Sequence, residues 1–237
     1  MARGTVKVTA KRIKRRESII KKVSIIIIVL ILFLLILLSI LSLIYRGGDF
    51  LITLDPQFSL KSGLVMFDDP EIKNNKIKMY VTGPDFMDNI SIDWLPENID
   101  DARGGSHNGD NYIAYTFYIE NRGTKEVDYW YEITIDDVIK NVDDAIRVMV
   151  IRNKERIVYA KVNELTKEEE PGTTKFYNSS VAVLEQRKGI ERKEIDKYTI
   201  VIWIEGNDPD CLDNLIGGEI KLSMRIIESH TRGEREQ

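Results

Sequence analysis

An uncharged apolar run from Val23 to Tyr45 constrains this chain more than any other feature. The run holds 23 residues, of which 19 are Val, Ile, Leu or Phe. As an α-helix rising about 1.5 Å per residue it is roughly 34 Å long, enough to cross a hydrocarbon core about 30 Å thick. The alternative, a buried core helix, would need a large soluble protein to surround it. We therefore predict a transmembrane helix at residues 23–45, with the lipid bilayer as its partner.

The charges that flank the run predict its orientation. Residues 1–22 carry nine basic residues and a single acid, Glu17. The positive-inside rule keeps this basic tail in the cytoplasm and places the C-terminal domain outside the cell. A nuclear or nucleic-acid-binding tail is the second interpretation of the same charges. Beside a membrane span, topology control and contact with anionic headgroups are the favoured use.

A cleaved signal peptide is the competing interpretation of the span. Secretory apolar regions are about 7–15 residues long and end at a small-x-small cleavage site. This run is longer, and its last turns, residues 38–45, contain no such site. The sequence therefore favours an uncleaved signal anchor in the cell membrane, crossing once.

The remainder of the chain has the opposite charge. Removing the nine basic residues and one acid of the tail from the totals of 34 and 38 leaves 25 basic and 37 acidic residues, a net charge of −12. This balance argues against nucleic acid as a partner of the exterior domain. Cys211 is the only cysteine, so no intrachain disulfide is expected and the fold must rest on its apolar core.

Short alternating segments follow the span. The juxtamembrane segment, residues 46–110, is the least periodic part, and the pattern sharpens over residues 111–228. Tyr112–Glu120 and Val127–Ile135, joined by a four-residue turn that contains Gly123, predict a β-hairpin. Residues 146–151 and 156–161 predict a second hairpin. Residues 186–196 are predicted to be a loop or a short exposed helix. The other predicted strands are 50–54, 64–67, 76–82, 90–94, 181–184, 198–204 and 220–226.

These segments predict a mainly β fold. Several short strands with turn signals between them, and no long amphipathic helix after residue 46, are typical of an antiparallel β-sandwich of Ig-like or jelly-roll type. We expect the transmembrane helix to precede this exterior domain, whose core lies in residues 111–228. Residues 229–237 form a polar C-terminal tail.

Residues that could perform catalysis are few. The two histidines, His107 and His230, show no His-Glu-x-x-His spacing for zinc, and no Gly-x-Ser-x-Gly elbow accompanies His107. Cys211 lies among carboxylates, which disfavour a thiolate, so we expect an inert thiol. The sequence predicts no catalytic residue and no cofactor other than a possible calcium ion.

One acidic loop is a candidate calcium site. Asn207, Asp208, Asp210 and Asp213 lie close together in sequence, with Glu205 at the edge of the loop. Calcium takes six to eight oxygen ligands, which such loops commonly supply. The fit to an EF-hand is poor, and Asn and Asp are also ordinary turn residues that bond their own backbone. A structural turn is therefore the alternative.

A family resemblance covers roughly residues 110–228. The pattern of strand, Asn-x-Gly-Thr and strand at 112–135, with Pro171-Gly172-Thr173-Thr174, Trp203–Cys211 and Gly217-Gly218 after it, resembles bacterial exported surface proteins of the camelysin and TasA type. The resemblance implies export, a jelly-roll sandwich, and polymerisation by donation of an N-terminal strand. Camelysin has been called a metallopeptidase, but no zinc motif is present here to carry that activity over. The small-residue cleavage site expected in that family is also missing.

These observations predict a non-enzymatic, membrane-anchored extracellular protein of the bacterial cell surface, acting in adhesion, matrix or cell-envelope interactions. Trp130 and Trp203 lie on the strand faces opposite their apolar Tyr and Ile neighbours. They are therefore candidates for contact with a partner, unless a loop covers them. A fibre subunit assembled by donor-strand exchange is the alternative, with self-association through a sheet edge or through strand 50–54. A metal-dependent hydrolase is the third hypothesis.

Overall fold

The computed structural model describes residues 3–45 and 50–228, and the chain divides into two compact units, Met1–Gly47 and Gly48–Gln237. The first unit contains one helix, α1 (Arg3–Tyr45). Its segment Lys14–Ile40 is long and apolar enough to cross a membrane, and the apolar window within this segment is not buried. The helix begins well before the predicted span, so most of the basic tail is helical. The predictions for residues 46–49 and for 229–237, which include His230, lie outside the described residues.

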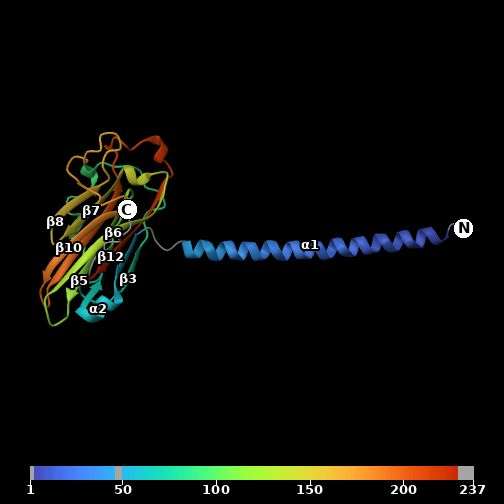
Figure 1. Ribbon diagram of the computed structural model, residues 1–237, viewed down its shortest axis with the longest axis horizontal. Coiled ribbons are helices and arrows are strands. Elements are labelled where there is room, and N and C mark those ends of the chain that lie inside the picture. The colour runs from blue at the N-terminus through green and yellow to red at the C-terminus, as the bar shows by residue number, and fades with distance from the viewer. Residues whose placement is uncertain (1–2, 46–49, 229–237) are drawn as a thin grey trace, which may run out of the picture. The chain divides into compact units, whose positions relative to one another are not determined.

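The second unit, which we call the β domain, is built from two sheets (Figure 1). The five-stranded sheet has the order β10-β6-β12-β1-β3, and the larger sheet has the order β2-β5-β11-β7-β8-β9 with β4 also paired to β5. The strands are β1 (Phe50–Leu54), β2 (Leu64–Phe67), β3 (Lys78–Val81), β4 (Gly105–Ser106), β5 (Tyr112–Asn121), β6 (Val127–Ile139), β7 (Ile146–Arg152), β8 (Glu155–Ala160), β9 (Thr174–Lys175), β10 (Val181–Ile190), β11 (Ile195–Ile204) and β12 (Glu219–Ile227). Helix α2 (Pro56–Ser62) and four 3-10 turns, Ile92–Trp94, Ile99–Asp101, Val142–Asp144 and Asp213–Leu215, complete the described elements.

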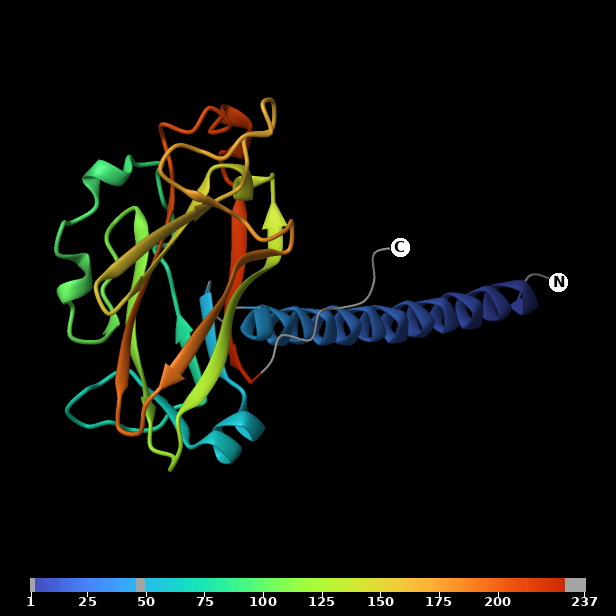
Figure 2. The same ribbon diagram turned by 60° about the vertical axis from the view of Figure 1, so that its left-hand side comes forward.

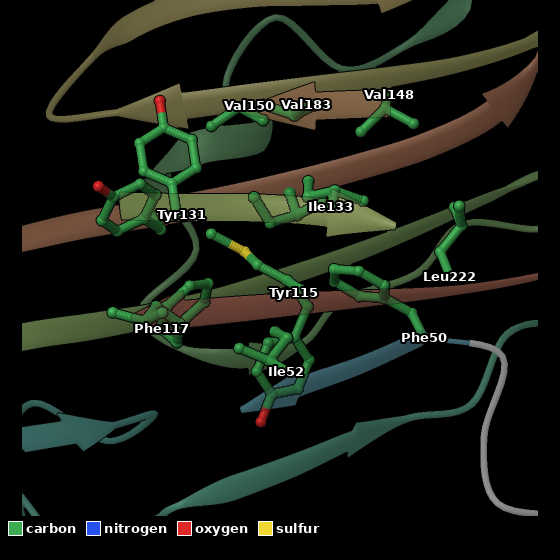
Figure 3. Packing of buried hydrophobic residues seen from close by; sticks show 14 of the residues in the cluster. Phe50, Ile52, Tyr115, Phe117, Tyr131, Ile133, Val148, Val150, Val183 and Leu222 are labelled. Carbon is green, nitrogen blue, oxygen red and sulfur yellow. The ribbon is translucent and has the colours of Figure 1, made fainter. Parts of the chain in front are cut away.

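The main core lies between the two sheets (Figure 3). Phe50 and Ile52 of β1 and Ile133 of β6 contribute from the five-stranded sheet, and Phe117 of β5 and Val148 of β7 contribute from the larger one. Each of these side chains is at most 1% exposed. The mainly β fold predicted from the alternating strands is confirmed.

A second apolar cluster lies on the opposite face of the larger sheet. Ala114, Met149, Val201 and Trp203 alternate with core residues along β5, β7 and β11, and the segment that contains Ile90, Leu95 and Ile99 packs on them. The central strands of this sheet are therefore buried on both faces. Residues that precede position 110 thus have two roles: they form strands β1 to β4, and they cover this second cluster.

The predicted hairpin at 112–135 is wrong. β5 and β6 have the predicted positions, but β5 pairs with β2, β4 and β11, whereas β6 pairs with β10 and β12 in the other sheet. The connection crosses between the sheets and is held by Asn121, which is fully buried. Its side-chain amide donates to the carbonyls of Lys125 and Ile190 at 2.8 Å each, and its Oδ1 accepts from the N–H of Gly123.

Other strand predictions have mixed outcomes. The second hairpin is confirmed as β7 paired with β8. The prediction for 186–196 is wrong, because β10 continues to Ile190 and β11 begins at Ile195; β10 is an edge strand, which tolerates charged side chains. The strand predicted at 90–94 is also wrong, since Ile90 makes one isolated bridge and a 3-10 turn follows. The sheets are not purely antiparallel either, because β1 pairs with β12 and β8 with β9 in parallel.

Asp68, just after β2, provides a pH-dependent contribution to stability. Its carboxylate accepts hydrogen bonds from Lys76 Nζ at 2.6 Å and from Tyr115 at 2.7 Å. Burial would raise the pKa of Asp68, but the bonds from Lys76 and Tyr115 outweigh it and hold the pKa below the ordinary 3.8. A lowered carboxyl pKa stabilises the fold above the unfolded-state pKa, and this stabilisation is lost as the pH falls through the folded value.

We therefore expect Asp68→Asn to lower the free energy of unfolding at pH 7. Most of this difference between the two forms should disappear as the pH falls below 3.8, the ordinary pKa of an aspartate. Urea unfolding of both forms between pH 7 and pH 2.5 measures the difference. A difference that stays constant with pH would contradict the role of the ionised carboxylate.

Candidate cation site

Two loops that are distant in sequence meet at one end of the β domain. They are the connection between β8 and β9, residues 161–173, and the connection between β11 and β12, residues 205–218 (Figure 2). The N–H of Glu164 in the first loop donates to Asp210 Oδ2 in the second at 2.9 Å. We call this region the loop end of the β domain.

Three carboxylates gather at the loop end. Glu170, Asp208 and Asp210 each offer one oxygen, and these oxygens all lie within 4.8 Å of one another. Glu170 is 6% exposed and Asp208 5%, while Asp210 is half-buried. The N–H of Asp210 donates to Asp208 Oδ1 at 2.8 Å, so the turn itself fixes the spacing of these two side chains.

One buried cation faces this group. Arg147 of β7 is 4% exposed, and its Nη2 lies 2.6 Å from Asp208 Oδ2 and 3.9 Å from Glu170 Oε2. Arg147 and Asp208 thus form a buried ion pair, and no hydrogen bond to Asp208 Oδ2 is found among the described residues. Oε1 of Glu170 is likewise buried without a hydrogen-bond partner there. A single guanidinium therefore balances only part of the negative charge.

A second acidic pair lies at the same end of the domain. Lys161 Nζ bridges Asp143 Oδ2 at 2.9 Å and Asp144 Oδ1 at 2.5 Å. Burial raises the pKa of Asp144, Lys161 opposes this shift, and the charges of Asp143 and Glu164 add to it. Negative charge thus extends beyond the three-carboxylate group.

The structure brings together two of the four residues predicted to bind calcium. Asp208 and Asp210 belong to the group, whereas Asn207 donates from its amide to Ser91 Oγ at 3.0 Å and Asp213 is exposed outside it. Asn207 and Asp213 therefore lie outside the three-carboxylate group, and calcium binding by these two residues stays a prediction. The sequence prediction also missed Glu170, because that residue lies in another loop, within a run of three glutamates that looks like an ordinary solvated segment.

Glu205, predicted to lie at the edge of the loop, has structural partners instead. Its carboxylate accepts from Trp203 Nε1 and from the N–H of Ile92 at 3.0 Å each, and from the N–H of Asn207 at 3.2 Å. Trp203 is fully buried in the second cluster, so it is excluded as a surface contact, whereas Trp130 is half-buried.

The remaining singled-out residues also have local partners. His107 is half-buried, and its two ring nitrogens each lie 3.1 Å from a backbone carbonyl, one of Gly105 and one of Ile99. Cys211 is half-buried, with its sulfur 3.4 Å from Asn89 Nδ2. These contacts hold the cover of the larger sheet in place.

Comparisons with known proteins give little guidance. No protein-family model matches the chain, and no curated protein matches it either. Two crystal structures of a β-glucosidase from Kluyveromyces marxianus, one of them in complex with glucose, are similar to 70% of this chain at 10% identity, with TM-scores of 0.26 and 0.25. The matched part spans 16% and 15% of those chains. Likeness at this level supports no conclusion about fold or activity.

Proposed function

We propose that this chain is a non-enzymatic, single-pass membrane protein of the bacterial cell surface. Residues 1–22 lie in the cytoplasm, residues 23–45 form an uncleaved anchor, and the β domain lies outside the cell, where it takes part in adhesion, matrix or cell-envelope contacts. The observation that carries the proposal is an apolar helix with a basic flank on one side and a separately compact, acidic domain on the other.

The nature of the β domain supports a binding role. Two packed sheets of short strands suit an Ig-like or jelly-roll sandwich, and the sequence resemblance to camelysin and TasA-type surface proteins agrees with this class. The negative charge of the domain favours cations or basic surfaces as partners and disfavours nucleic acid. His107 and Cys211, the described residues with the most obvious catalytic chemistry, have structural partners.

The fibre alternative depends on strand β1. Donor-strand exchange would require β1 to leave its own sheet, where it pairs with β12 on one side and with β3 on the other. Phe50, Ile52 and Leu54 would then withdraw from the core, in which each is at most 2% exposed. This arrangement favours the anchored-domain proposal over donation of residues 50–54. Self-association through an edge strand such as β3 requires no such withdrawal.

Cysteine labelling in cells tests the topology. In a Cys211→Ser background, Lys14→Cys and Lys188→Cys place single thiols at exposed positions in the helix and in the β domain. We expect a membrane-impermeant maleimide to label Lys188→Cys in intact cells, and Lys14→Cys only after lysis.

The reverse labelling pattern would overturn the orientation. Release into the medium of a shortened form that carries position 188 but not position 14 would overturn the uncleaved anchor. Retention of the full-length chain in the membrane fraction is the result expected from the proposal.

A further inference from the structure

We propose that Glu170, Asp208 and Asp210 bind one calcium ion at the loop end of the β domain. This ligand set joins two loops, and it includes a glutamate that lies 38 positions before Asp208 in the chain. The site goes beyond the proposed anchor function, since it gives the exterior domain a specific ligand.

The charge balance of the group calls for a divalent cation. The group holds three carboxylates, and the guanidinium of Arg147 is the one positive charge among the described residues that faces them. Two negative charges are therefore left without a counter-charge in the group. Unbalanced charge is costly in a buried environment, where water cannot solvate it. One calcium ion brings the group to neutrality and leaves the Arg147 contact in place.

Glu170 gives an independent indication of a ligand. The residue is more than nine-tenths buried, yet its Oε1 has no hydrogen-bond partner among the described residues. Buried carboxylate oxygens are normally satisfied, and an exception in a folded protein needs an explanation such as a bound ion. Its carboxylate also lies within 4.8 Å of those of Asp208 and Asp210, so one ion can contact all three.

The chemistry of the group favours calcium, and its spacing admits the ion. Calcium–oxygen distances of about 2.3–2.6 Å place ligands on opposite sides of the ion roughly 4.6–5.2 Å apart, so one calcium ion can contact oxygens that lie within 4.8 Å of one another. Magnesium demands near-ideal octahedral geometry and keeps several of its waters, so a set of three carboxylates from two loops suits calcium better. The group is all oxygen, which suits a hard cation and not zinc or copper. Bidentate carboxylates and water can complete the six to eight ligands.

Bound calcium would tie the 161–173 loop to the β11–β12 connection. Glu170 lies near the end of the first loop, and the 2.9 Å bond from the Glu164 N–H to Asp210 already joins the two connections near its start. The exposed Lys167 lies between these two attachments. Calcium is therefore expected to slow tryptic cleavage after Lys167.

Calcium binding can be measured on the full-length chain in detergent micelles. After removal of divalent ions with a chelator, calcium chloride should give one binding event by titration calorimetry and a rise in Tm, and magnesium chloride a smaller rise. Glu170→Gln and Asp210→Asn should each weaken calcium binding about tenfold or more, because calcium affinity depends on the number of charged ligands. Circular dichroism confirms that each variant is folded.

Two matched controls make the test specific. Asp213→Asn changes an exposed acid in the same connection as Asp210, and Glu169→Gln changes the exposed neighbour of Glu170. Both controls should bind calcium like the unmodified chain. Absence of heat and of any Tm change at 5 mM calcium, or unchanged binding in Glu170→Gln and Asp210→Asn, would overturn the site. Unchanged Lys167 cleavage with calcium bound would overturn the loop-tying role.

Discussion

Replacing Asp196 with alanine is expected to lower the free energy of unfolding of the β domain by about 3–5 kcal/mol. Asp196 lies in β11 and is fully buried. Its carboxylate accepts hydrogen bonds from the Tyr129 hydroxyl at 2.8 Å, from Arg187 Nε at 3.0 Å and from Asn153 Nδ2 at 2.6 Å. Alanine would leave the largely buried guanidinium without this partner, and such losses are among the most destabilising single changes. Urea unfolding at pH 7 measures the effect.

The large effect follows from the position of this network between the sheets. Tyr129 and Arg187 belong to strands of the five-stranded sheet, whereas Asp196 and Tyr198 belong to β11 of the larger one. The hydroxyls of Tyr129 and Tyr198 lie 2.8 Å apart, and burial raises the pKa of both phenols, so they stay protonated as donors at neutral pH. The network thus supplies a directional contact between two otherwise apolar faces.

A nearby acid serves as the control for Asp196. Glu191 lies in the β10–β11 connection, just before the strand that carries Asp196, and is exposed, so Glu191→Ala should change the free energy of unfolding by no more than about 0.5 kcal/mol. A loss below about 1 kcal/mol for Asp196→Ala would contradict its role as a link between the sheets.

The positions of most strands could be predicted from sequence, but apart from the β7–β8 hairpin their partners could not. The alternation at 127–135 predicts a strand with one buried face, and β6 is such a strand. A short turn that contains Gly123 fits both a hairpin and a crossover between sheets. Whether the turn makes a hairpin or a crossover depends on the strands that pair with β5 and β6. In the structure β5 lies between β2 and β11, whereas β6 lies between β10 and β12 in the other sheet. These partners are set by tertiary packing, and no local pattern specifies them.

The candidate cation site shows the same division between local and long-range information. The dense acids of residues 207–213 identify the β11–β12 connection, and Asp208 and Asp210 do belong to the group. Glu170 and Arg147 come from other parts of the chain, and only the fold brings them to this loop. A local pattern of acids could therefore indicate two of the three carboxylates. It also includes Asn207, whose amide donates to Ser91, and Asp213, which is exposed outside the group.

Trp203→Ala is the second large effect that we expect, a loss of about 3–5 kcal/mol in the free energy of unfolding. The indole is fully buried on the outer face of the larger sheet, against the segment that carries Ile90 and Leu95. Its Nε1 donates to Glu205 Oε2, which also accepts from the N–H of Ile92, so the substitution removes both packing and one hydrogen bond of this shared acceptor. Urea unfolding gives the total effect, and hydrogen exchange of the amides of residues 90–101 gives its local part.

Trp94 is the matched control, because it lies in the same covering segment but its side chain is 73% exposed. Trp94→Ala should therefore change the free energy of unfolding by about 0.5 kcal/mol or less.

Hydrogen exchange shows what holds the covering segment, residues 90–101, on the sheet. If Trp203 chiefly holds this segment, the amides of residues 90–101 should exchange faster in Trp203→Ala than the global loss of stability predicts. The ion pairs of Asp100 with Lys154 and Arg156 at 3.1 and 2.7 Å are the alternative attachment. Unchanged relative protection of residues 90–101 would show that these pairs suffice, and that the indole stabilises the sheet itself and not its cover.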